Sequence, residues 1–132
     1  TYHGSAMSPV VQAASIAAWN DEAHVMENRA AYQAKFEAML PLLEDVLEVR
    51  APDAGFYLWA GVPQTLYGGC DVEFAKALLG QCNVQVLPGS LLAREAQGVN
   101  PGDGRVRMAL VAEVAQCTEA AHRIRRFIQG QS

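Results

Sequence analysis

The sequence predicts an α+β fold, a two-layer domain with helices packed on one face of a small, mainly antiparallel sheet. Three observations lead to this prediction. Several segments carry apolar residues at spacings of three and four, as on amphipathic helices. Short β-branched or aromatic segments lie between them, as expected for strands. Glycine and proline turns join these strands closely, so hairpins and antiparallel pairing are favoured.

Two helices are expected first. Ser8 can cap a helix that begins at Pro9, where the missing N–H costs nothing, and this helix should stop near Trp19. Asn20 is expected to cap a long second helix, which Pro41 should kink near its end. The apolar stripe of this helix consists of Val25, Tyr32, Phe36, Met39, Leu40 and Leu43.

Four strands are expected next, with one helix among them. Residues 46–50 and 56–60 should form a hairpin, and residues 84–87 and 105–110 should form two further strands. Asp71 is expected to cap a short helix between the pairs. Its inward residues should be Val72, Ala75, Leu78 and Leu79, and those of the last helix Val114, Cys117, Ala121, Ile124 and Ile128. Residues 91–103 should be irregular, and at this length a functional role is expected.

Composition narrows the function. The 132 residues fit one domain, and 51% hydrophobic residues with a net charge of −4 are typical of a globular protein. Nucleic acid is not an expected partner, because the only basic cluster lies near the end of the last helix, where it complements the helix dipole. No apolar run could span a bilayer and no signal peptide is recognisable, so the predicted location is cytoplasmic. The basic cluster consists of Arg123, Arg125 and Arg126.

Cysteine and histidine spacings suggest no metal site. The three cysteines are far apart and form no CxxC pair, so free thiols are expected, and the histidines show no ligand spacing either. The chain begins with Thr1 in place of methionine, and we expect it to be a fragment. The cysteines are Cys70, Cys82 and Cys117, and the histidines are His3, His24 and His122.

One arginine stands out as a candidate ligand for an anion. On a strand over residues 105–110, alternation sends Val106, Met108 and Leu110 to one face and Arg105, Arg107 and Ala109 to the other. A guanidinium on a rigid strand beside a small residue suits bidentate binding of a carboxylate. The alternative is that these arginines simply form the solvated side of a sheet.

No complete catalytic apparatus accompanies the candidate arginine, Arg107. The sequence has no GxSxG elbow and no P-loop. The only two lysines, Lys35 and Lys76, are expected to be solvated helix residues, so covalent amine catalysis is not indicated.

In order and spacing, the chain resembles the C-terminal part of class I and II, fold type I, pyridoxal-phosphate-dependent aminotransferases. Within that family it is most similar to the N-succinyldiaminopimelate aminotransferases of bacterial lysine biosynthesis, on its residues 1–9 and 92–95. The motifs that carry the wider resemblance are Gln12-Ala13-Ala14, Arg29 in the long helix, Gly55-Phe56-Tyr57-Leu58-Trp59, Val84 to Ser90 with Pro88-Gly89, and Gly102 to Met108.

The resemblance implies roles for particular residues. Arg107 would bind the substrate carboxylate, and Tyr2 and His3 would reach the pocket of the partner subunit in a homodimer. Arg105 stands where relatives often carry an aromatic residue, so its role stays open, as does that of Arg94. No metal ligand, cofactor-binding residue or catalytic residue is assigned in this chain.

The resemblance also implies what lies outside the chain. Pyridoxal phosphate, its lysine and most of its binding site would belong to a missing large domain, and this fragment alone would bind no cofactor. Residues 1–45 would be helices leading from that domain, and residues 46–132 the small C-terminal domain. The implied reaction moves an amino group between an amino acid, N-succinyl-LL-diaminopimelate, and a 2-oxo acid such as 2-oxoglutarate. The alternatives are an aminotransferase with another substrate and a non-catalytic small-molecule-binding or regulatory module.

Overall fold

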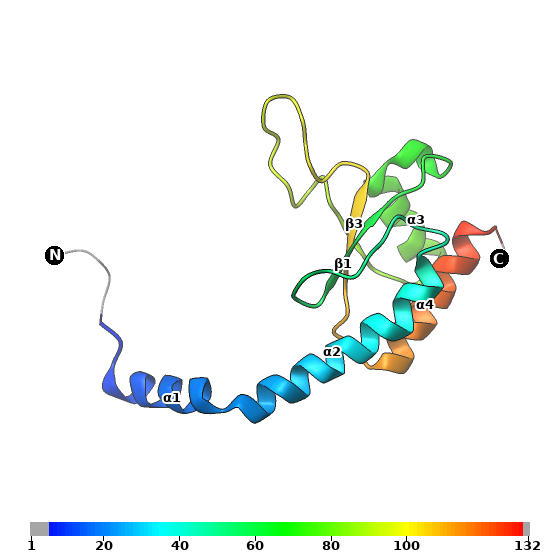
Figure 1. The fold of residues 1–132 in the computed structure, drawn as a ribbon. Coiled ribbons are helices and arrows are strands. Elements are labelled where there is room, and N and C mark those ends of the chain that lie inside the picture. The colour runs from blue at the N-terminus through cyan, green and yellow to red at the C-terminus, as the bar shows by residue number, and fades with distance from the viewer. Residues whose placement is uncertain (1–5, 131–132) are drawn as a thin grey trace. The chain divides into compact units, whose positions relative to one another are not determined.

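The computed structural model describes residues 6–130 and divides into two compact units, which meet between Ala31 and Tyr32 inside a long helix. The first unit contains α1 (Pro9–Asn20) and the start of α2 (Glu22–Leu43). The second contains the end of α2 and all later elements (Figure 1). These are β1 (Tyr57–Gly61), the 3-10 helix η1 (Tyr67–Gly69), α3 (Asp71–Cys82), β2 (Leu87–Pro88), β3 (Arg105–Ala109) and α4 (Val114–Ile128).

The first unit confirms the expected start of α1 and corrects the start of α2. Ser8 caps α1 by accepting a hydrogen bond from the Val11 N–H, and Pro9 is its first residue. Asn20 does not cap α2, because it is the last residue of α1. The Asp21 carboxylate takes that place, with Oδ1 3.1 Å from the Ala23 nitrogen. This carboxylate also accepts from the His24 N–H, so it satisfies two backbone donors at the start of α2.

The second unit confirms the α+β prediction. Its sheet is antiparallel, with the strands in the order β1-β3-β2. Leu58 pairs with Met108 and Ala60 with Val106, and all four side chains are buried. This face of the sheet packs against helices, and the shared core includes Met39 and Leu43 of α2, Phe74 and Leu78 of α3, and Cys117, Ala121 and Ile124 of α4.

Of two predicted strands, one does not form and the other is shorter than expected, because helix ends use their N–H groups. Residues 46–50 do not form a strand, and only a bridge from Glu48 to Gly61 remains of the hairpin. The N–H groups of residues 46 and 47 both bond to the Leu43 carbonyl, which prolongs the turn that ends α2. Similarly, the N–H of Val84 bonds to the Leu78 carbonyl at the end of α3, so β2 begins only at Leu87.

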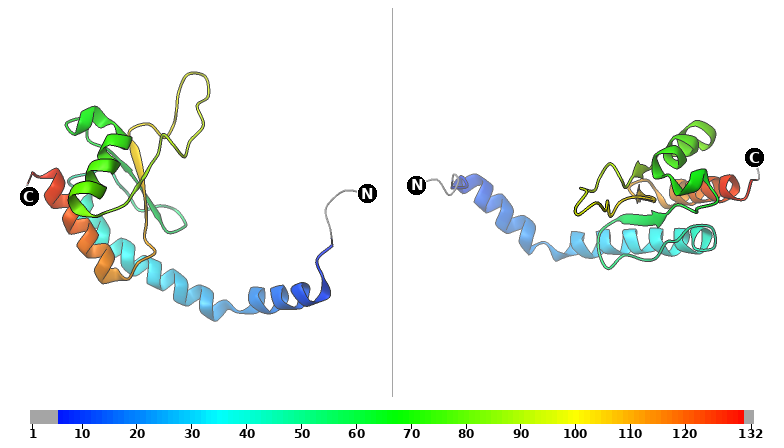
Figure 2. Two further views of the ribbon diagram at one scale, coloured as in Figure 1. Left: turned by 180° about the vertical axis from the view of Figure 1, so that it is seen from behind. Right: turned by 90° about the horizontal axis from the view of Figure 1, so that it is seen from above.

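The inward faces of the last two helices are partly as predicted. In α3, Ala75 and Leu78 are buried, but Leu79 is 51% exposed and the fully buried Phe74 was missed. In α4, Val114 at the first position is exposed, whereas Cys117, Ala121 and Ile124 are buried as expected. Residues 91–103 form the irregular connection that was predicted, and they project from the end of the sheet at which β3 begins (Figure 2).

Candidate functional site

The second face of the sheet carries the candidate arginine. Alternation along β3 is as predicted, with Val106 and Met108 buried and Arg105 and Arg107 on the other side. The strand register places Trp59 of β1 and Leu87 of β2 directly opposite Arg107, one on each side. Side chains directly opposite in neighbouring strands share a face. Arg107 is therefore the central residue of a three-strand row.

The Arg107 guanidinium is held without an acidic partner among residues 6–130. Its Cζ lies 4.5 Å from the centre of the Tyr57 ring, in cation–π contact. Its Nε is buried and has no hydrogen-bond partner. A buried donor without an acceptor is costly, and a carboxylate would satisfy it while pairing with the charge. The arrangement is therefore suited to binding an anion.

Arg105 has a different environment. Its Nη2 lies 3.0 Å from Glu48 Oε1, and the side chain is 32% exposed. Gly61 lies opposite Arg105 in the sheet and also forms the bridge with Glu48. A Cβ at Gly61 would lie 2.9 Å from Glu48 Oε2, so glycine leaves the room that the pair requires. Only Arg107 of the two is without an ionic partner.

The start of β3 is anchored by close backbone contacts. Asp71 does not cap α3 as expected: Cys70 is at the capping position, and the buried Asp71 carboxylate accepts the Ser90 N–H at 2.8 Å. The Asn100 amide then donates to the Ser90 carbonyl and accepts from the Gly102 N–H. These bonds connect α3, the end of β2 and the segment that leads into β3.

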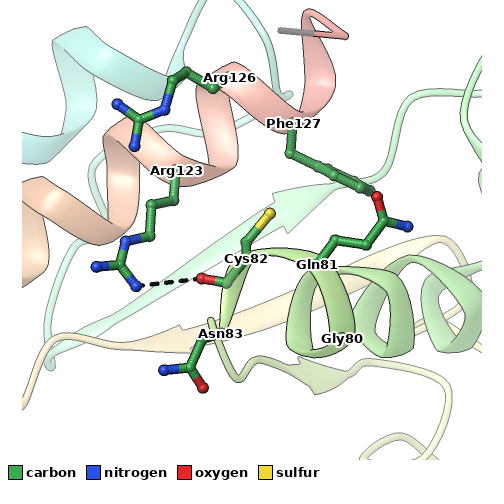
Figure 3. A pocket seen from close by; sticks show the side chains of 7 residues that line it. All are labelled: Gly80, Gln81, Cys82, Asn83, Arg123, Arg126 and Phe127. Atoms are coloured by element: carbon green, nitrogen blue, oxygen red, sulfur yellow. Dashed lines mark hydrogen bonds between the residues drawn. The ribbon is translucent and has the colours of Figure 1, made fainter. Parts of the chain in front are cut away.

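A hollow between the end of α3 and α4 contains two arginines, but both have an ionic partner. Gly80, Gln81, Cys82, Asn83, Arg123, Arg126 and Phe127 line it (Figure 3). Arg123 donates to the Cys82 carbonyl and to Glu119, and Arg126 lies 3.7 Å from the same glutamate. Burial raises the pKa of the Cys82 thiol, although both arginines oppose this effect. A protonated thiol is a poor nucleophile, so this hollow offers no catalytic group.

The lysines do not provide an amine for covalent catalysis. Lys76 is exposed and pairs with Glu73, as expected of a solvated residue. Lys35 was also expected to be solvated, but it is half-buried: its Nζ donates to the Leu110 carbonyl at 3.0 Å and lies over the Tyr32 ring. The Lys35 ammonium group therefore helps to hold α2 against the end of β3.

Other predicted features are placed as follows. Tyr2 and His3 lie outside the described residues, so their predicted contact with a partner subunit stays a prediction. Arg94 is an exposed residue of the 91–103 segment. The three cysteines are free thiols. Within residues 6–130, no group of three metal-ligating side chains comes together, and no helix is long and apolar enough to cross a membrane.

Comparison with known proteins gives a consistent result. The family described as aminotransferase class I and II matches residues 2–124. An LL-diaminopimelate aminotransferase of Nitratidesulfovibrio vulgaris is 32% identical over 93% of this chain and 30% of its own. An aminotransferase structure from Neisseria meningitidis has 54% identity and a TM-score of 0.84, covering 93% of this chain and 30% of that one.

A probable N-succinyldiaminopimelate aminotransferase from Thermus thermophilus is also similar in structure. It has 34% identity and a TM-score of 0.58, covering 73% of this chain and 23% of that one. The present chain thus spans about 30% of the length of the first relatives that it matches.

Proposed function

We propose that this chain, which belongs to the class I and II aminotransferase family, is the small C-terminal domain of a larger enzyme and supplies its substrate-carboxylate arginine. The observation that carries the proposal is the position of Arg107, central on the open face of the sheet with a buried Nε that lacks an acceptor. The family assignment favours an enzyme over the alternative of a non-catalytic binding module. We further propose a division at residues 45 and 46, with residues 1–45 leading from the large domain.

In the intact enzyme, Arg107 would act by orientation. Two parallel hydrogen bonds from a guanidinium to the α-carboxylate would fix the position and the angle of the amino acid. Trp59 and Leu87 flank the arginine and would limit the access of water to this ion pair. The same contacts would serve the 2-oxo acid, because it carries the same carboxylate.

Aminotransferases of this family generally use pyridoxal phosphate, which carries the amino group between the two substrates. The described residues do not fit its lysine: Lys35 is bonded to a backbone carbonyl and Lys76 is exposed and paired. We propose that the cofactor and its lysine belong to the part of the enzyme outside these 132 residues. The chain alone should then bind no pyridoxal phosphate.

The names of the relatives point to the substrate class. LL-diaminopimelate and N-succinyldiaminopimelate both appear among them, so we propose a diaminopimelate or its N-succinyl derivative as amino donor, with 2-oxoglutarate as acceptor. We also propose a homodimer, in which Tyr2 and His3 reach the partner's pocket.

Turnover by the full-length enzyme tests this proposal. With pyridoxal phosphate bound, it should transfer the amino group of at least one of the two diaminopimelates to 2-oxoglutarate, and the isolated 132-residue chain should be inactive and show no near-visible cofactor absorbance. An active isolated chain, or an intact enzyme that accepts neither donor, would contradict the proposal.

A further inference from the structure

We propose that Arg105 and Glu48 form a second charged subsite, which binds the far end of an amino acid substrate when that end carries both a carboxylate and an ammonium group. This inference rests on the proposed function, because it takes Arg107 as the ligand of the α-carboxylate. It adds the class of side chain that the enzyme should prefer.

The first argument is the common face of the two arginines. Arg105 and Arg107 are two residues apart on β3, so their side chains leave the same side of the sheet, with Cα atoms about 7 Å apart. A substrate bound by its α-carboxylate at Arg107 and lying along the strand would bring the end of a side chain of several carbons to Arg105.

The second argument is a hollow at that position. Arg105, Glu48 and Trp59 line a cavity of about 560 Å³, together with Arg50 and Asp53. Trp59 is also the residue directly opposite Arg107 in the sheet, so the same residue neighbours Arg107 and lines the hollow. An apolar side chain beside both arginines matches a molecule with methylenes between two charged ends.

The third argument is the charge pattern. The Glu48 side chain is 77% exposed, and exposed ion pairs contribute little stability, so opening this pair should cost little. Arg105 could then bind a distal carboxylate while Glu48 accepts hydrogen bonds from the neighbouring ammonium. A distal end that carries only a carboxylate would still bind Arg105, but less tightly, because Glu48 would lie beside it with no ammonium group to accept hydrogen bonds from. The pair should therefore favour free LL-diaminopimelate over its N-succinyl derivative.

Kinetics of the full-length holoenzyme with three amino donors would test this subsite. The donors are LL-diaminopimelate, N-succinyl-LL-diaminopimelate and norleucine, whose side chain is uncharged. Arg105→Gln should lower kcat/KM at least about tenfold for both diaminopimelates and change that for norleucine less than about threefold. Glu48→Gln should lower kcat/KM for the free diaminopimelate and leave that for the N-succinyl derivative unchanged or higher.

The matched controls are Arg126→Gln and Glu119→Gln, which disrupt an ion pair on α4 instead. They should leave the preference among the three donors unchanged. An equal loss for all donors in Arg105→Gln, or no loss, would overturn the subsite.

Binding of simple acids to the holoenzyme separates this inference from the proposed function. By calorimetry, Arg105→Gln should weaken pimelate, a dicarboxylate, at least about tenfold and leave heptanoate nearly unchanged. This result would support the subsite even if neither diaminopimelate were a substrate. Equal effects on the two acids would contradict the subsite even in an active aminotransferase.

Discussion

The guanidinium of Arg107 lies against the ring of Tyr57, with 4.5 Å between Cζ and the ring centre. The sheet register explains this contact. Tyr57 is paired with Ala109, two residues beyond Arg107, so the ring and the guanidinium are diagonal neighbours on one face. Ala109 has only a methyl group, and the ring can therefore reach the arginine.

Replacing Arg107 tests its role in binding. Arg107→Gln in the full-length enzyme should reduce kcat/KM for every carboxylate substrate, at a cost of about 2–5 kcal/mol in transition-state binding. The reason is that Arg105, the other arginine of β3 on this face, is paired with Glu48, whereas the Nε of Arg107 has no acceptor. Steady-state kinetics would measure the loss, and near-normal values would contradict the role.

Tyr57 should support Arg107 through its ring and not through its hydroxyl. Tyr57→Leu removes the π face, and a contact of about 1 kcal/mol predicts roughly a fivefold lower kcat/KM. Tyr57→Phe keeps the ring and should stay within about twofold of the wild type. Equal losses in the two variants would show that the hydroxyl matters instead.

Gly102 should tolerate no side chain. A Cβ there would lie 2.1 Å from the Gly89 carbonyl oxygen, and backbone cannot move aside as a flexible side chain can. Gly102→Ala should therefore lower the free energy of unfolding by about 3 kcal/mol. Gly80→Ala is a matched control with the opposite sign. Gly80 lies inside α3 and a Cβ there would have nothing within 4 Å, so we expect the free energy of unfolding to rise by about 0.4–1 kcal/mol. Urea titration would measure both.

The buried Asp71 carboxylate should be important for stability. Asp71→Ala removes the acceptor of the Ser90 N–H and an acidic group from the first turn of α3, with an expected loss of about 1.5–3 kcal/mol. Glu73→Ala in the same turn removes an exposed carboxylate and should cost less than about 0.5 kcal/mol. Comparable losses in urea titrations of the two variants would contradict this account.

The ion pair between Asp45 and Arg125 should make stability depend on pH in acid. The bidentate hydrogen bonds from Arg125 lower the pKa of the Asp45 carboxyl. A lowered pKa means that the stabilisation is present above the unfolded-state pKa, about 3.9, and is lost as the pH falls through the folded-state value. Unfolding titrations from about pH 5 to about pH 2 should show a smaller decrease in Asp45→Asn than in the wild type.

The sequence was sufficient for features that depend on local periodicity. Alternation identified the buried and open faces of β3, and spacing identified α4 and the end of α2. Features that depend on competition for backbone hydrogen bonds were not predictable. Leu43 takes the N–H groups of the expected strand after α2, and the Ser90 N–H takes the Asp71 carboxylate away from the capping position. The Leu43 carbonyl competes locally, three and four residues before these N–H groups, whereas the Ser90 N–H reaches Asp71 only when segments 19 residues apart fold together.

Within the candidate site, the same distinction applies. Strand alternation predicted the open face on which Arg107 lies, and its role as the carboxylate ligand, which the family resemblance implies, stays a prediction. Arg105 and Glu48 are 57 residues apart in sequence, and their ion pair requires a glycine, Gly61, between them. No local pattern could therefore reveal this pair. The structure has only one bridge where a hairpin of residues 46–50 and 56–60 was expected. The predicted hairpin therefore did not place Glu48 beside Arg105 either.

The close approach of Gly89 and Gly102 has a consequence for how this protein can vary. The two backbones touch, so the intervening residues leave and return at nearly one point. A segment closed at its base in this way can be lengthened, shortened or exchanged at small entropic cost and without moving the strands on either side. Residues 91–99 are therefore a suitable place for grafting a foreign loop that changes which molecules reach the sheet.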